Sequence, residues 1–210
     1  INSTGGGGGG APAGNPVSVG SVGTGTLPKG VFVSGAYAYV VNGTSDTLQV
    51  FNISKSTAPA LISTSATSGS NPSSIYVQGK YAYILNFSSN TLQVFDVSNP
   101  NTPLNFGAVS TGSAPESIYV SGKYAYVVNS TSNTLQIFDI SNPGALTVAG
   151  SISTGTSTAP MSVYVSGKYA YVACYGTGSF KIYDISNPVS PSSVGSLSIA
   201  ESYDVYVAGN

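Results

Sequence analysis

Charge is scarce in this sequence. Asp, Glu, Lys and Arg together make up 6% of the 210 residues, against roughly 25% in ordinary soluble proteins. The six basic and seven acidic side chains nearly cancel, so no basic surface is available for nucleic acid. Uncharged Ser, Thr, Asn, Gly and Tyr must keep the surface hydrated. Because hydroxyl and amide groups stay uncharged over a wide pH range, this composition favours an extracellular or cell-surface location.

The sequence has no His, no Arg and no Trp, and its single cysteine is Cys174. One cysteine cannot form an intrachain disulfide, and zinc sites built from several Cys and His are excluded. Without His, the Ser-His-Asp and Cys-His catalytic arrangements are excluded too. No apolar run approaches the roughly 18–20 residues that span a membrane. We therefore expect no metal, no cofactor and no membrane span.

The first sixteen residues differ in composition from the rest. A run of glycines from Gly5 to Gly10 predicts a flexible arm over residues 1–16. It does not lie between a strand and a helix, so it is not a phosphate-binding loop. The chain begins at Ile1 and shows no signal peptide, which fits either prior removal of such a signal or a part of a longer product.

A tandem repeat of about forty-three residues occupies positions 17–210. It is marked by the glycine that ends a Val-x-Gly motif, at Gly35, Gly79, Gly122, Gly167 and Gly209. Each full repeat contains four short apolar or β-branched segments separated by turns. The second repeat illustrates this with strands predicted at 74–77, 81–85, 91–97 and, more weakly, 104–110, and Pro100 interrupts the third.

Four short strands in a period of this length predict one blade of an all-β propeller. The inner strands are apolar on both faces, as expected for sheets packed between neighbouring blades. We expect full blades near residues 30–66, 74–111, 117–154 and 162–199.

Partial strands are predicted at the two ends of the repeat region. Residues 17–24 read as an outer strand with no blade before it, and residues 204–208 read as an inner strand with no blade after it. Either roughly twenty-five residues that complete a blade are missing or another chain supplies them. As edge strands, both segments would favour self-association.

Three segments resemble the LVIVD repeat of bacterial and archaeal propellers: residues 92–100, 135–143 and 180–188. The Gly-Lys-Tyr-Ala-Tyr-Val segments are similar to the same repeat and to YVTN-type surface-protein propellers. The resemblance covers residues 17–210 and implies a β-propeller that is exported or cell-surface located. It implies no particular activity, because propellers host many functions.

Lysine and aspartate recur at fixed positions in three blades. The expected cross-strand pairs are Lys80 with Asp96, Lys123 with Asp139, and Lys168 with Asp184. In the first blade both positions change together, to Ala36 and Asn52. An exposed ion pair contributes roughly 0–1 kcal/mol, and the aspartates also suit capping of the Ser-Asn-Pro turn. We predict structural roles for these six residues.

Asparagine-linked glycosylation sequons occur at Asn2, Asn42, Asn52, Asn86 and Asn129. Asn42, Asn86 and Asn129 share one turn position in successive blades, which we expect to be exposed, and they are the glycosylation candidates. Asparagine also suits tight turns for structural reasons. In the fourth blade this position is Cys174, which has no Lys or His close in sequence to activate its thiol.

Glu116 and Asp204 fall near the starts of inner strands, at the mouth of a central channel. A facing pair of carboxylates there could act in general acid–base catalysis or bind Ca²⁺, although nothing in the sequence shows that they face each other.

Three functions follow from these features. The first is a non-catalytic structural or adhesive building block of a cell-surface layer or filament. The alternative is a carbohydrate-binding module that uses the loop face rich in Ser, Thr and Asn. A propeller enzyme using Glu116 and Asp204 has the weakest basis.

Overall fold

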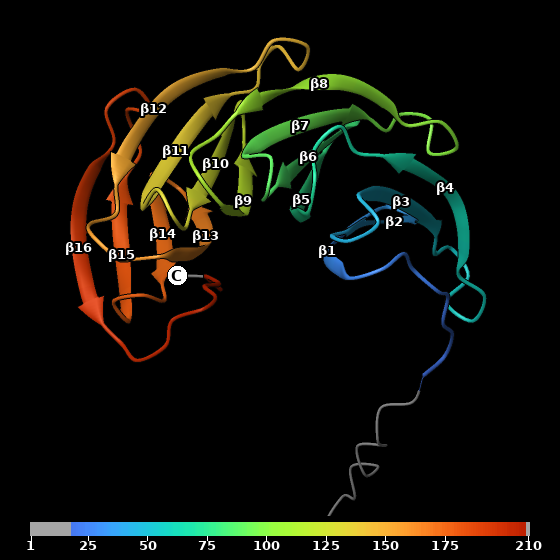
Figure 1. Cartoon of the computed structure of the whole chain (residues 1–210), viewed down its shortest axis with the longest axis horizontal. Coiled ribbons are helices and arrows are strands. Elements are labelled where there is room, and N and C mark those ends of the chain that lie inside the picture. The colour runs from blue at the N-terminus through green and yellow to red at the C-terminus, as the bar shows by residue number, and fades with distance from the viewer. Residues whose placement is uncertain (1–17, 209–210) are drawn as a thin grey trace, which may run out of the picture.

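The computed structural model describes residues 18–208, which form sixteen β-strands and no helix. The arm predicted at residues 1–16, the sequon at Asn2 and Val17 lie outside the described residues. Figure 1 shows the strands grouped into four sheets along an arc. The predicted all-β propeller architecture of four-stranded blades is therefore confirmed. No helix in the described part of the chain is long and apolar enough to cross a membrane.

Each sheet is one antiparallel blade of four consecutive strands. Blade 1 contains β1 (Pro28–Ser34), β2 (Tyr37–Asn42), β3 (Thr47–Asn52) and β4 (Ala60–Ala66). Blade 2 contains β5 (Pro72–Gln78), β6 (Tyr81–Asn86), β7 (Thr91–Asp96) and β8 (Leu104–Ser110). Blade 3 contains β9 (Pro115–Ser121), β10 (Tyr124–Asn129), β11 (Thr134–Asp139) and β12 (Thr147–Ser153). Blade 4 contains β13 (Pro160–Ser166), β14 (Tyr169–Cys174), β15 (Ser179–Asp184) and β16 (Ser192–Ser198).

The first strands of successive blades contact one another on the concave side of the arc, and the fourth strands form its rim (Figure 1). Two-residue turns join the first and second strands. Their leading glycines have φ near +60°, at Gly35, Gly79, Gly122 and Gly167. A positive φ at the first turn residue suits a tight hairpin and favours glycine.

The core lies between the blades. We call the face of a blade that meets the preceding blade its front face, and the opposite one its back face. Between blades 1 and 2, the back face contributes Tyr39, Val41, Leu48 and Val50, and the front face contributes Ile75, Val77, Ala82, Ile84, Phe95 and Val97. Equivalent residues pack blade 2 on blade 3 and blade 3 on blade 4. Aliphatic and aromatic residues on both faces of each sheet thus explain why single strands do not alternate strictly.

Each inner strand carries a β-bulge near its start. The register skips one residue in each blade, at Lys29, Ser73, Glu116 and Met161. A bulge re-aims the side chain of the extra residue, so these four positions differ in direction from the regular strand that follows.

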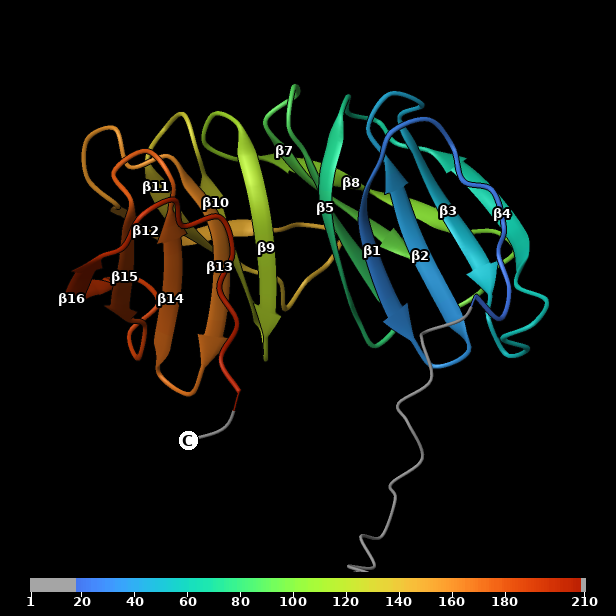
Figure 2. The same ribbon diagram turned by 90° about the horizontal axis from the view of Figure 1, so that it is seen from below.

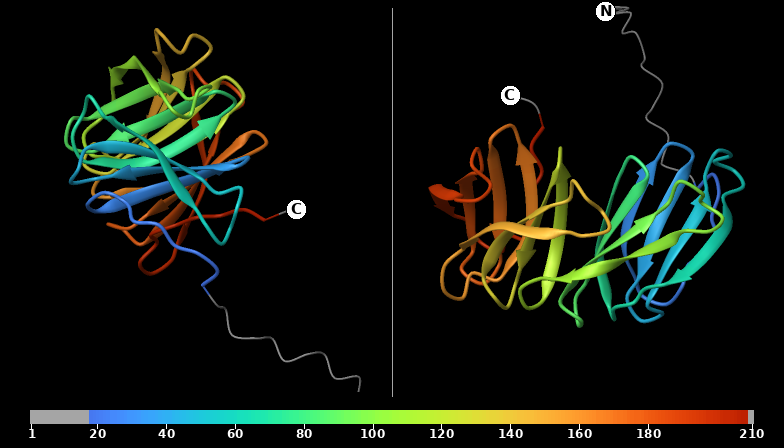
Figure 3. Two further views of the ribbon diagram at one scale, coloured as in Figure 1. Left: turned by 90° about the vertical axis from the view of Figure 1, so that its right-hand side faces the viewer. Right: turned by 90° about the horizontal axis from the view of Figure 1, so that it is seen from above.

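The predicted terminal strands do not form. Residues 18–24 and 204–208 adopt no strand conformation, because neither segment has a neighbouring strand that completes a ladder with it. Figure 2 shows the segment after β16 running beside β13. The right-hand view of Figure 3 places blades 1 and 4 at opposite ends of the arc, with no sheet beyond either among the described residues.

Candidate functional site

The loops joining β2 to β3 and β4 to β5 lie on one face of blade 1, which we call the top face together with the equivalent loops of the other blades. Loop-to-loop backbone hydrogen bonds hold them together: Thr67 N donates to Asp46 O at 2.9 Å, and Thr111 N donates to Asn90 O at 2.9 Å. The loop face rich in Ser, Thr and Asn is therefore built from the loops of successive blades.

A buried polar network underlies this face. In blade 1 the Nδ2 group of Asn42 donates to Thr47 Oγ1 at 3.1 Å and to Gln49 Oε1 at 3.0 Å. Gln49 Oε1 also accepts a hydrogen bond from Gly25 N at 2.8 Å. The same network recurs with Asn86, Thr91 and Gln93 in blade 2 and with Asn129, Thr134 and Gln136 in blade 3.

This network corrects the predicted exposure of the three asparagines. Asn42, Asn86 and Asn129 are each 0% exposed, and the amide nitrogen that would carry a glycan donates two hydrogen bonds inside the protein. The expectation of an exposed turn was wrong, because these residues end a strand and point beneath the loops. The folded structure therefore gives their glycosylation no support.

A second set of side chains links neighbouring blades across the top face. Asp46 Oδ1 accepts a hydrogen bond from Asn71 N at 2.6 Å, and Asn90 Oδ1 accepts one from Ala114 N at 2.7 Å. Asn133 Oδ1 contacts the start of blade 4 in the same way. All three have positive φ, a conformation that Asn and Asp tolerate better than most residues. These hydrogen bonds hold the segment that leads into each blade against a top-face loop of the preceding blade.

Blade 4 replaces the whole network. Cys174, Ser179 and Lys181 stand where the other blades have Asn, Thr and Gln. Lys181 Nζ donates to Thr154 O, whereas the glutamines accept from backbone N–H groups. Burial raises the pKa of the Cys174 thiol, and Lys181 acts in the opposite direction. No lysine is close to this thiol along the chain, but the pairing of β14 with β15 brings Lys181 near it.

The three lysine–aspartate pairs lie at the opposite, bottom face. Their Nζ to Oδ2 distances are 3.6 Å for Lys80–Asp96, 3.9 Å for Lys123–Asp139 and 3.6 Å for Lys168–Asp184. Each aspartate also caps the following turn, as where Ser98 N donates to Asp96 Oδ1 at 2.8 Å. Hydrogen bonds from Ser98, followed by the charge of Lys80, hold the pKa of Asp96 below its usual range.

In blade 1 the cap survives without the ion pair. Ser54 N donates to Asn52 Oδ1 at 2.9 Å. The turn cap is therefore common to all four blades, and the lysine adds to it in three of them.

Glu116 and Asp204 contact different blades. Glu116 is the bulge residue of β9, and its Oε1 accepts a hydrogen bond from Ser130 Oγ at 3.3 Å. Burial raises its pKa, while Ser130 and Lys29 act in the opposite direction. Asp204 is exposed, and its Oδ1 accepts a hydrogen bond from Ser162 Oγ at 2.6 Å. No hydrogen bond joins the two carboxylates, and residues 18–208 contain no group of three or more Cys, Asp or Glu that could hold a metal.

An aromatic belt crosses the inner strands, and sequence analysis missed it. Ring centroids are 4.6 Å apart for Phe32–Tyr76, 5.3 Å for Tyr76–Tyr119, 4.8 Å for Tyr119–Tyr164 and 5.2 Å for Tyr164–Tyr206. The available signal was the aromatic residue that directly precedes every Val-x-Gly motif. Tilted rings at these spacings add packing energy beyond the area they bury.

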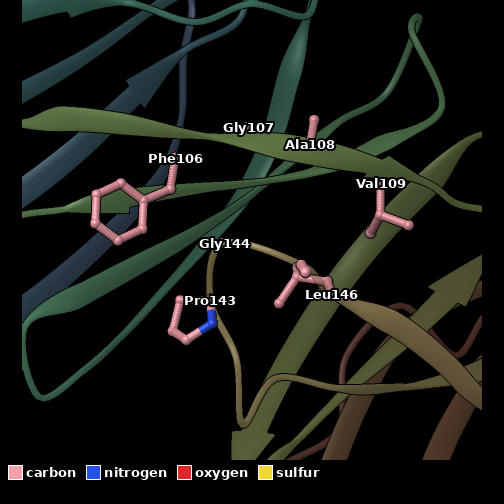
Figure 4. Close-up of a pocket in the computed structure, with 8 residues that line it drawn as sticks. Phe106, Gly107, Ala108, Val109, Pro143, Gly144 and Leu146 are labelled. Carbon is pink, nitrogen blue, oxygen red and sulfur yellow. The ribbon is translucent and has the colours of Figure 1, made fainter.

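Two surface features occur in single blades and do not recur along the arc. Tyr175 and Tyr203 stack at 4.4 Å near the top of blade 4, and they are 42% and 54% exposed. A hollow at the rim lies between β8 and the turn before β12 (Figure 4). Phe106, Pro143 and Leu146 surround it, and it presents no charged side chain.

The repeat itself decides the family. The LVIVD repeat matches the chain four times, over residues 28–67, 69–111, 112–154 and 159–199. The protein belongs to the LVIVD-repeat family. Each match in this LVIVD-repeat protein begins at a first strand or just before it and ends at or just after a fourth strand, so one repeat corresponds to one blade. No curated protein is similar to the chain in sequence.

Solved structures similar to the LVIVD-repeat protein include the periplasmic gluconolactonase of Pseudomonas aeruginosa. Its TM-score is 0.74 at 17% identity, over 84% of this chain and 55% of that one. A protein of Lactobacillus plantarum has a TM-score of 0.73 at 15% identity, over 81% of this chain and 55% of that one. The computationally designed Ika4 protein has a TM-score of 0.61 at 13% identity, over 80% of this chain and 98% of that one. The chain thus spans little more than half the length of the two natural proteins, and the likeness shows a shared fold alone.

Proposed function

We propose that this protein is a non-catalytic structural or adhesive building block of an extracellular layer or filament. The observation that carries this proposal is that apolar side chains are exposed at the end of the arc formed by blade 1. Val31 and Val33 on β1 are 65% and 57% exposed, whereas the equivalent Ile75 and Val77 in blade 2 are 6% and 5% exposed. Apolar residues at positions that the fold otherwise buries mark an interaction surface.

Self-association through the ends of the arc follows from this proposal. The sequence predicts this self-association from residues 17–24 and 204–208 acting as edge strands. Neither segment forms a strand in the described part of the chain, so the exposed blade faces are the main support for self-association. The sparse charge agrees with this mode of association, because few charges near the ends oppose the approach of another copy.

Electron microscopy of natively sourced material tests the proposal. We expect filaments, sheets or other ordered assemblies that contain this chain. Material found only as dispersed single molecules would contradict the building-block function.

The exposed pair Tyr175–Tyr203 favours a second candidate, a carbohydrate-binding module on the top face. Aromatic rings offer apolar surface to the C–H face of a sugar, and nearby hydroxyl and amide groups can hydrogen-bond its hydroxyls. A glycan array should then show binding that Tyr175→Ala abolishes, while Tyr206→Ala, which removes another exposed tyrosine from the segment after β16, should leave it intact. Uniformly negative arrays would remove this candidate and leave the first one standing.

A further inference from the structure

We propose that copies of this chain dock head to tail, with the front face of blade 1 of one copy packed on the back face of blade 4 of the next. The segments 18–24 and 202–208 occupy parts of these two surfaces and are displaced when the copies join. This inference rests on the proposed building-block function and identifies the surface that performs it.

The back face of blade 4 lacks the cover that the other back faces have. In blade 3 the equivalent residues Leu135 and Ile137 are 0% exposed. In blade 4 their counterparts Phe180 and Ile182 are only half-buried. They line an apolar groove with Leu197, which is 62% exposed. This face therefore carries the residues of a blade interface, and no blade faces it within residues 18–208.

The segment after β16 occupies the place of an inner strand. Val205 N donates to Ser162 Oγ at 3.4 Å, as Val163 N donates to Ser117 Oγ at 3.3 Å between blades 3 and 4. The ring of Tyr206 also contacts Tyr164 as part of the aromatic belt. In β1, Val31-Phe32-Val33 repeats the pattern of Val205-Tyr206-Val207. A first strand from another copy can make the same contacts and adds a complete sheet behind them.

The segment before β1 likewise occupies the place of a rim strand. A Cβ added at Gly20 would lie 2.3 Å from Ser56 O, in the turn after β3. Between blades 3 and 4, a Cβ at Gly150 of β12 would lie 2.2 Å from Pro188 O, in the equivalent turn. Residues near Gly20 thus lie against the turn after β3 of blade 1, as β12 lies against the equivalent turn of blade 4.

Gly195 of β16 is the counterpart of Gly150, since each pairs with the isoleucine at the same position of its blade, Ile182 and Ile137 respectively. A Cβ at Gly195 would meet nothing within 4 Å. The rim strand of blade 4 therefore has a small residue at this position, as blade 1 has with Ser63, which donates to Pro100 O in the turn of blade 2. In the described part of the chain no turn lies against Gly195.

A second copy fits these surfaces because one chain carries both halves of the interface. The front face of blade 1 has the residue types that pack on back faces inside the chain, and the back face of blade 4 has those that pack on front faces. Such a contact uses two different patches on each copy. It closes into a ring if the rotation allows and otherwise continues as a filament.

The test measures the mass of the purified 210-residue chain by light scattering and sedimentation, from about 1 to about 100 µM. We expect concentration-dependent association. A front variant, Val31→Lys with Val33→Lys, and a back variant, Phe180→Lys with Ile182→Lys, should each weaken it at least about tenfold. The control, Leu104→Lys with Val148→Lys, changes exposed apolar residues of the rim and should associate as the unchanged chain does.

Mixing distinguishes this arrangement from a symmetric one. The front variant keeps a working back face and the back variant keeps a working front face, so an equimolar mixture should form a one-to-one dimer. A back variant that still dimerises alone would indicate a front-to-front contact and overturn the proposal.

Gly195→Arg guards against variants that fail to fold. This position meets open space in the single chain. Its counterpart in blade 1, Ser63, donates a hydrogen bond to Pro100 O in the turn of the next blade at 2.6 Å, so a long charged side chain would clash with the turn of a docked copy. We expect unchanged circular dichroism and at least about tenfold weaker association. Unimpaired association of this variant would contradict the docked geometry.

Deletion of residues 202–210 separates face docking from strand exchange. Face docking predicts tighter association, because a competitor for the back face is removed, whereas strand exchange through this segment predicts a loss. Association that none of the face variants changes would reject the surface and leave the building-block function standing. A chain that stays monomeric at every concentration would contradict both.

Discussion

The amide nitrogen of Asn86 lies 3.2 Å from Oε1 of Gln93, seven residues further along the chain. The same oxygen accepts a hydrogen bond from Ser68 N at 3.2 Å, in the segment that leads from blade 1 into blade 2. One buried oxygen thus joins two strands of a blade to the backbone that enters it.

Replacing Gln93 with Leu should therefore be costly. The change keeps the volume but removes the acceptor that the buried amide of Asn86 shares with the partly buried Ser68 N–H, and we expect the free energy of unfolding to fall by about 1–3 kcal/mol. The matched control is Gln78→Leu, which removes an exposed amide and should change stability by less than about 0.5 kcal/mol. Urea unfolding of both variants gives the comparison, and equal effects would show that the network adds nothing.

A second pair of variants tests the hairpin turns. Gly79 has φ of +60° and no atom within 4 Å of an added Cβ, so Gly79→Ala introduces backbone strain without a clash. We expect a loss of about 1–2 kcal/mol. Gly195→Ala, also in open space but without a positive φ, should be neutral or slightly stabilising in the dilute, monomeric protein. Thermal unfolding of the two variants should isolate the cost of the positive φ, because neither added methyl group meets another atom.

The turn caps predict a dependence of stability on pH. The pKa values of Asp96, Asp139 and Asp184 are lowered in the folded protein. The main cause is hydrogen bonds from the serine two residues after each aspartate, and the lysines have smaller effects. Their contribution is therefore fully present above the unfolded pKa, near 4, and is lost as the pH falls through the lower folded values. Replacing all three with Asn should leave stability near neutral pH almost unchanged, as Asn52 caps its own turn. The triple variant should lose less melting temperature than the unchanged protein between pH 5 and about pH 2.5.

Cys174 should react slowly in the native state. It is 0% exposed, and burial raises the pKa of its thiol, so both access and thiolate content are low. We expect alkylation near pH 8 to be at least about a hundredfold slower than in the urea-unfolded chain. Mass spectrometry follows the modification. Equal rates in the two states would place the thiol at the surface.

Much of the fold is readable from the sequence because each blade repeats the same local signals. The glycine turns, the apolar strands and the Lys80–Asp96 pair are all short-range features, and the structure contains each of them. The burial of Asn86 depends on a loop from the preceding blade, which no local pattern specifies. A signal was nevertheless present, since Asn, Thr and Gln recur together at one spacing in three blades and change together in the fourth.

The contact between Lys181 and Cys174 could not be predicted from the sequence for a different reason. Lys181 is seven residues away along the chain, and only the register of β14 with β15 brings the two together. Likewise, the aromatic belt joins residues about forty-three positions apart, so it follows from the stacking of blades and not from any single one.

Because each blade packs only on its neighbours, stability in this arc resembles a chain of nearest-neighbour couplings. Blades 2 and 3 are held on two sides, whereas blades 1 and 4 are each held on one. Amide hydrogens of the central blades should consequently exchange with solvent most slowly, and opening should start at the ends. Joining one arc to another would erase this gradient, so the exchange profile of an assembled sample would report how many of its ends remain free.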